Sequence, residues 1–169
     1  MEALRHTHAC FATLPAQVVT VCDREGDMDD LFLRARQLDR PLLVRARNRV
    51  VNKSATHSKI SGEKLTALFD KKKASGSLQI RLPKSKDKPA REAVCDVKVT
   101  EITMTPPRNH AKPADGKLPH LSLYAVRVVE KKPPSGSDPV DWLLVTSLKV
   151  KTLEQAVEKV KWYCLKFSF

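Results

Sequence analysis

The sequence predicts a mixed α/β fold of the α+β type, and three observations support this class. Two short apolar runs, 18–23 and 42–48, enclose a stretch with helical spacing. From Ser77 onward the apolar segments alternate with polar residues, as in strands. The last segment, 152–167, carries an apolar stripe at helical spacing, and Thr152 is a candidate N-cap for this helix. A length of 169 residues and a hydrophobic fraction of 41% are typical of one globular domain.

The first unit is a predicted strand, helix and strand. VVTVCD (18–23) is rich in β-branched residues and stops at Asp23. In the following stretch, 24–38, Leu31, Phe32 and Ala35 recur at helical spacing. Pro41 ends this helix, and LLVRARN (42–48) has the length of a strand. This succession implies a parallel pair of strands covered by helices.

The middle of the chain is predicted to be rich in antiparallel strands. Residues 49–62 are polar, and 63–73 can form a short helix. The predicted strands are 77–82, 93–104, 121–132 and 140–148. Their connections hold most of the eleven prolines, which is typical of surface loops.

The strand 93–104 changes phase along its length. Cys95 and Val97 share one face, whereas Ile102 and Met104 continue in the opposite phase. A bulge or twist near residues 100–101 would reconcile the two halves.

Composition restricts the class of partner. The net charge of +12 favours a polyanion such as nucleic acid, although a basic surface can also serve solubility alone. No apolar run approaches the ~18 residues that a membrane helix needs, so we expect a soluble, cytoplasmic protein. The four cysteines form no CxxC pair, which argues against a structural zinc site or a disulfide framework.

Asp23 is the first candidate site residue. It ends an apolar strand, where a carboxylate faces the crevice that commonly binds ligands in open α/β sheets, and it could ligate a metal ion there. Alternatively, Asp23 caps the following helix through its side-chain oxygen.

Basic and aromatic residues supply the other candidates. Arg45 and Arg47 lie two residues apart on one predicted strand face, where they could bind phosphates or form a solvated rim. Trp142 begins an apolar strand and is either a core residue or a platform for an unstacked base. Tyr163 and Lys166 share a helix face that could meet a phosphate or line a solvated edge.

Three segments carry a resemblance to a known family: CDREGDMDDLF (22–32), LLVRARN (42–48) and DWLLVTSLKVKTLEQAVEKVKWYCLK (141–166). Their order and spacing resemble the catalytic region of bacterial DDE transposases of the insertion sequence four family, which bear a Tyr-Arg-Glu-Lys signature. The resemblance implies a ribonuclease H-like fold interrupted by a mainly β insertion. Residues 1–48 would be part of the catalytic core, 49–148 the insertion, and 149–169 the core helix that precedes the catalytic glutamate.

The resemblance also implies roles for individual residues. Asp23 would be the second of three carboxylates that bind Mg2+ ions. Arg45 would contact the DNA backbone near the cleavage site, and Trp142 would stack against a flipped base. Tyr163 matches the signature tyrosine beside the terminal phosphate. Lys166 stands in the place of the signature arginine, which keeps the charge but loses the bidentate fork.

The other two carboxylates of that family have no counterpart in the sequence. Only 22 residues precede Asp23, too few for the unit that bears the first aspartate, and the glutamate position falls one residue beyond Phe169. Family members cleave and join DNA in transposition and act as homodimers. The resemblance therefore implies a transposase fragment that is inactive alone. The alternative is a DNA-binding remnant without catalysis, or a non-functional relic.

Overall fold

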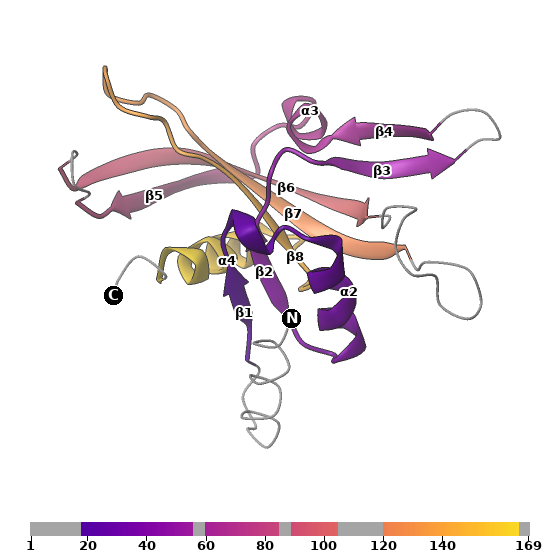
Figure 1. The fold of residues 1–169 in the computed structure, drawn as a ribbon. Coiled ribbons are helices and arrows are strands. Elements are labelled where there is room, and N and C mark those ends of the chain that lie inside the picture. Colours follow the sequence, from indigo (N-terminus) through magenta and orange to yellow (C-terminus); the bar gives the residue numbers. More distant parts are fainter. Residues whose placement is uncertain (1–17, 56–59, 85–88, 105–119, 166–169) are drawn as a thin grey trace.

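The computed structural model describes residues 18–55, 60–84, 89–104 and 120–165. Its main element is a six-stranded mixed sheet in the order β1-β2-β8-β7-β6-β5, and a separate hairpin pairs β3 with β4 (Figure 1). In chain order the elements are β1 (Thr20–Cys22), the 3-10 helix η1 (Arg24–Gly26), α2 (Asp29–Gln37), β2 (Leu42–Arg45), β3 (Val50–Ala55), β4 (Ile60–Lys64), α3 (Leu65–Asp70), β5 (Gly76–Leu82), β6 (Arg91–Met104), β7 (Leu121–Glu130), β8 (Asp141–Thr146) and α4 (Leu153–Leu165).

The predicted strand-helix-strand unit is confirmed. β1 and β2 pair in parallel, with Val21 opposite Leu43, and η1 and α2 connect them. The face of α2 that bears Leu31, Phe32 and Ala35 is buried, as the helical spacing predicted.

The predicted antiparallel set is also confirmed. β5, β6, β7 and β8 pair antiparallel in chain order. β8 then pairs antiparallel with β2, which joins the antiparallel set to the parallel pair in one sheet. The fold class is therefore α+β, with helices on both faces of a mixed sheet.

Of the two expectations for the middle of β6, a bulge or a twist, the bulge is wrong. β6 pairs with β7 in one unbroken register, from Cys95 opposite Glu130 to Met104 opposite Leu121. The burial pattern changes phase because the strand contributes to cores on both faces of the sheet. Its first half buries Cys95 against the core that contains α4, and its second half buries Met104 against the core that contains α2 and α3.

The molecule thus has three layers around the sheet. On one face α2, α3 and the β3–β4 hairpin cover the sheet, with Phe32, Val51 and Phe69 buried beneath them. On the other face α4 covers the sheet with Ala156 and Tyr163. The hairpin and α3 lie above the sheet in Figure 1.

The hairpin is an element that the sequence did not predict, because residues 49–62 are mostly polar. A register shift falls between Val51 and Ser54, and Asn52 adopts a left-handed conformation there, with φ 52°. The Asn52 side chain accepts a hydrogen bond from the backbone N–H of Thr103 at 2.7 Å, which ties the hairpin to β6.

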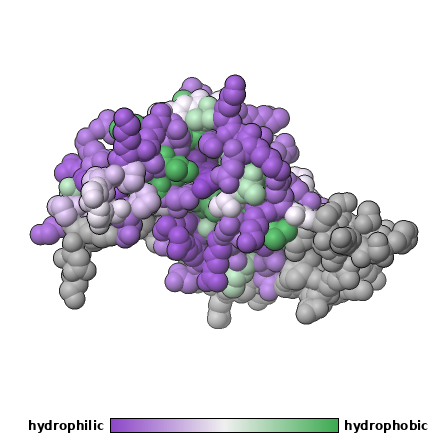
Figure 2. All heavy atoms as spheres, turned by 90° about the horizontal axis from the view of Figure 1, so that it is seen from above, coloured by the Kyte–Doolittle hydropathy of each residue, from purple (hydrophilic) through white to green (hydrophobic). Residues whose placement is uncertain are grey.

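The surface seen from above in Figure 2 is largely hydrophilic, with small and separate hydrophobic patches.

The last helix begins as predicted. Thr152 accepts a hydrogen bond from the Gln155 backbone N–H at 3.3 Å, and the Gln155 side chain accepts one from the Thr152 N–H at 3.3 Å. This reciprocal pair is a capping box. Among the described residues, none of the helices combines the length and apolarity needed to cross a bilayer.

Candidate nucleic-acid interface

Four of the predicted site residues come from four elements that meet at one edge of the sheet. Asp23 directly follows β1, and Arg45 is the last residue of β2. Because β1 and β2 are parallel, their carboxyl ends lie together. β8 runs antiparallel to β2, so Trp142, near its start, lies at the same edge. We call Asp23, Arg45, Trp142 and Tyr163 the Asp23 edge.

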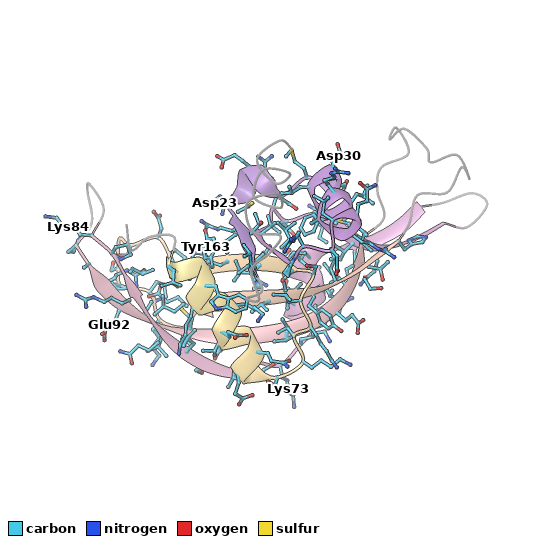
Figure 3. The ribbon with its side chains drawn as sticks, turned by 90° about the horizontal axis from the view of Figure 1, so that it is seen from below. Asp23, Asp30, Lys73, Lys84, Glu92 and Tyr163 are labelled. Carbon is cyan, nitrogen blue, oxygen red and sulfur yellow. The ribbon has the colours of Figure 1, made fainter. Side chains whose placement is uncertain are left out.

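Tyr163, in the last turns of α4, joins these residues. Its hydroxyl group donates a hydrogen bond to Oδ1 of Asp23 at 3.4 Å and accepts one from Nη1 of Arg45 at 3.4 Å. Its ring meets the Trp142 ring edge to face, with centroids 5.2 Å apart. Figure 3 shows Tyr163 on α4 and Asp23 near it, beyond the end of β1. A polar bridge therefore connects the α4 layer to β1 and β2.

The Tyr163 side chain is fully buried, and this burial affects the pKa of its phenol. Burial is the main cause of a raised pKa for its phenol, and the negative charge of Asp23 acts in the same direction. The hydrogen bond from Arg45 opposes that rise. The phenol is therefore a neutral donor and acceptor between a cation and an anion.

Asp23 caps the short 3-10 helix η1, and not α2 as the capping alternative expected, because Met28 stands at the N-cap of α2. Oδ1 of Asp23 accepts a hydrogen bond from the backbone N–H of Arg24 at 2.8 Å, at the start of η1. The same oxygen faces Tyr163, and the residue is partly exposed.

The described residues do not fit a two-metal centre. Within the described ranges, no group of three or more His, Cys, Asp or Glu side chains is placed to hold a metal ion. Two-metal phosphoryl transfer needs several carboxylate oxygens around ions about 3.5–4 Å apart, and Asp23 alone offers too few. The assignment of Mg2+ to Asp23 remains a prediction, and we derive no catalytic step through a metal.

The two arginines do not share a strand face, because β2 ends at Arg45 rather than at residue 48. Arg45 pairs with Leu144 in register, which turns its side chain toward α4 and Tyr163. Its Nε atom is buried and has no hydrogen-bond partner within the described part of the chain. Arg47 lies beyond the strand and is exposed, and its backbone N–H donates to Oδ2 of Asp27 at 2.8 Å.

An ion-pair cluster that the sequence did not predict fixes the loop bearing Arg47. Nη1 of Arg49 lies 2.7 Å from Oδ1 of Asp27, whose side chain is 3% exposed, and Arg49 also pairs with Asp29. Aspartates in the first turns of a helix are already favoured by the helix dipole, so their sequence positions do not indicate an ion pair. Their partner lies 20–22 residues away, beyond the reach of any local pattern.

Trp142 and Lys166 are the remaining two candidate site residues. Trp142 is only 7% exposed and packs in the α4 core, as the core alternative predicted. A base can stack on its ring only if that ring becomes accessible, so the stacking role stays a prediction. Lys166 lies outside the described residues.

A comparison of the sequence with models of known protein families finds no match.

Proposed function

We propose that this chain is part of the catalytic domain of a DDE transposase of the insertion sequence four family, with a ribonuclease H-like core, and that it binds DNA at the Asp23 edge. One observation carries the proposal. The resemblance assigns Asp23, Arg45 and Tyr163 to one site, and these residues, up to 140 positions apart in sequence, meet through hydrogen bonds. A cytoplasmic location and a homodimeric assembly on DNA ends belong to the same proposal.

We expect Arg45 and Arg47 to contact DNA phosphates in different ways. Arg45 is partly buried and is held from one side by Tyr163, so it can approach only a phosphate that reaches the sheet edge. Arg47 is exposed on a loop anchored by Asp27, where it can meet a phosphate without any rearrangement of the core. Guanidinium groups bind phosphate oxygens in a bidentate manner, and a net charge of +12 favours the encounter.

The proposed activity of this polypeptide on its own is binding without cleavage. Asp23 is the one carboxylate that the resemblance assigns to the metal site in this sequence. In-line displacement at a phosphate needs charge stabilisation at both the attacking and the leaving oxygen, which a single carboxylate cannot organise through two ions.

DNA binding is tested by fluorescence anisotropy with a labelled duplex at several salt concentrations. The logarithm of the affinity should fall with the logarithm of salt by about 0.9 per phosphate contacted. Arg47→Ala should reduce that slope by about 0.9. Arg81→Ala is the matched control. Arg81 is an exposed arginine on β5, which is the strand farthest from β1 in the order of the sheet. An equal change of slope in both variants, or a flat response to salt in the parent protein, would contradict binding at the Asp23 edge.

Cleavage is tested on the same samples by gel electrophoresis with and without Mg2+. We expect intact DNA in both cases. Mg2+-dependent products that disappear in Asp23→Ala would support the family assignment but overturn the proposal that this polypeptide is inactive alone. Salt-sensitive binding that is indifferent to Arg45→Ala and Arg47→Ala would instead favour the second candidate, a general DNA-binding remnant, for which the net charge is the supporting observation.

A further inference from the structure

We propose a second ligand site, for a small organic anion with an apolar body, at the end of the sheet opposite the Asp23 edge. A cavity of about 460 Å3 lies there, between the end of α2, the start of β7 and the segment that follows β8. This volume falls in the range typical of small-molecule sites, about 300–1,000 Å3. The site is separate from the Asp23 edge, because it adjoins Pro41 before β2, whereas Asp23 follows β1 and Arg45 is the last residue of β2.

The cavity has an apolar back and a polar rim. Phe32, Leu121 and Leu123 line it and are at most 4% exposed, so they form a solid back wall. The exposed residues Arg36 and Ser122 belong to the rim. Binding sites for small organic molecules commonly combine an apolar wall with a few polar groups that set orientation.

The charge of the rim selects an anion. Arg36 and Arg40 bring two positive charges to the lining, and Asp39 is its one acidic residue. Arg36 uses one donor, Nη1, on the backbone oxygen of His120 at 3.0 Å, and a guanidinium has five donors in all. The Ser147 hydroxyl oxygen accepts from the Leu42 N–H at 3.0 Å, which leaves its own hydrogen to donate.

The helix end that carries the arginines is rigidly built. The Arg40 N–H donates to Ala35 O at 2.9 Å and the Asp39 N–H to Arg36 O at 3.1 Å, which together form a Schellman motif. Asp39 occupies the left-handed position of that motif, with φ 49°, where glycine is the usual residue. Arg40 is thereby fixed at the cavity wall.

The helix dipole offers a simpler reason for basic residues at this place, because cations are favoured near a helix C-terminus. It accounts for the two arginines of the α2 end. It does not account for Ser122 on β7 or for Ser147 in the segment after β8, which line the same cavity. Donors from three parts of the chain around one apolar wall are the observation that points to a ligand.

Isothermal titration calorimetry of the full chain with phenyl phosphate, inorganic phosphate and phenol tests the site. We expect phenyl phosphate to bind about tenfold more tightly than inorganic phosphate, because its ring covers part of the apolar wall. Phenol, which lacks the charge, should bind more weakly than phenyl phosphate. Equal affinity for the two phosphates, or no saturable binding of phenyl phosphate, would overturn the proposal.

Variants separate this site from general attraction to a basic protein. Arg36→Gln and Arg40→Gln should each weaken phenyl phosphate binding about tenfold, since each loses charge-assisted hydrogen bonds. Arg34→Gln is the matched control: it removes the same charge from the same helix, and Arg34 does not line the cavity. Equal weakening in all three variants, or displacement of phenyl phosphate by saturating duplex DNA, would contradict a separate site. Thermal unfolding midpoints verify that each variant is folded.

Discussion

Replacing Tyr163 by phenylalanine isolates the polar bridge of the Asp23 edge from its packing. The variant keeps the buried ring and its edge-to-face contact with Trp142 but loses the hydroxyl group. Both hydrogen bonds of that hydroxyl, to Asp23 and from Arg45, measure 3.4 Å, longer than the usual ~2.5–3.2 Å. Each therefore contributes at the lower end of the usual range, about 0.5 kcal/mol.

We expect Tyr163→Phe to lower the free energy of unfolding by about 1 kcal/mol, which corresponds to about 2–4 °C in Tm for a chain of this size. Tyr163→Ala, which also removes the buried ring, should cost about 3–5 kcal/mol. Urea unfolding measures both values. Tyr124→Phe is the matched control, because the structure gives no hydrogen bond from the Tyr124 hydroxyl to the described residues, and its change should stay within about 0.5 kcal/mol.

The pH dependence gives a second measure of the same bridge. The pKa of Tyr163 is raised above its ordinary value of 10.0, chiefly by burial. The unfolded chain then loses this proton at a lower pH than the folded chain. The stabilising contribution is complete below about pH 10 and is lost as the pH rises through the folded pKa. Tyr163→Phe should therefore flatten the alkaline decline in stability.

The result that would refute the bridge is a Tyr163→Phe variant that matches Tyr124→Phe in both unfolding free energy and alkaline pH profile. That outcome would mean that the Tyr163 hydroxyl connects neither Asp23 nor Arg45 in solution. A double-mutant cycle between Tyr163→Phe and Arg45→Ala gives an independent check, and we expect a coupling of about 0.5 kcal/mol.

Two further predictions concern groups away from the phenol. Glu130 is buried, and hydrogen bonds from Arg91 are the main cause of its lowered pKa. Its stabilising contribution is therefore present above about pH 4.5 and is lost as the pH falls through the folded pKa. Glu130→Gln should cost about 2–3 kcal/mol at pH 7 in urea unfolding, the scale of its charge-assisted hydrogen bonds, and should flatten the acid decline; an unchanged acid profile would contradict this. Gly26→Ala should cost about 1–3 kcal/mol, because its Cβ would lie 2.5 Å from the Cβ of Cys22. Gly76→Ala should cost less, since the nearest atom is the end of the flexible Leu153 side chain, and equal losses would refute the distinction.

The order and type of most elements could be predicted because they depend on local patterns. Alternation predicted β5, and helical spacing together with Thr152 predicted α4. The phase change in β6 was interpreted as a bulge or a twist, since a sequence pattern cannot tell an extra residue from a strand that is buried on opposite faces along its length. The β3–β4 hairpin was missed because residues 49–62 are mostly polar, although Val51 packs in the main core cluster.

The candidate site could be predicted only in part, for a related reason. The resemblance selected Asp23, Arg45 and Tyr163, and the structure brings them together. It did not predict that Tyr163 and Trp142 would both be buried, which depends on α4 packing against the sheet. The cluster of Arg49 with Asp27 and Asp29 depends on a contact between separate loops, which no local pattern records.

The unbroken pairing of β6 with β7 affects how the protein unfolds. Because β6 supplies side chains to the cores on both faces, neither core can loosen while the other keeps its full set of contacts. The two faces should therefore unfold as one cooperative unit, and the backbone amides at the centre of β6 should exchange with solvent deuterium only through global unfolding. A strand shared in this way makes the sheet the common support of the Asp23 edge and of the cavity that Pro41 and Leu121 line.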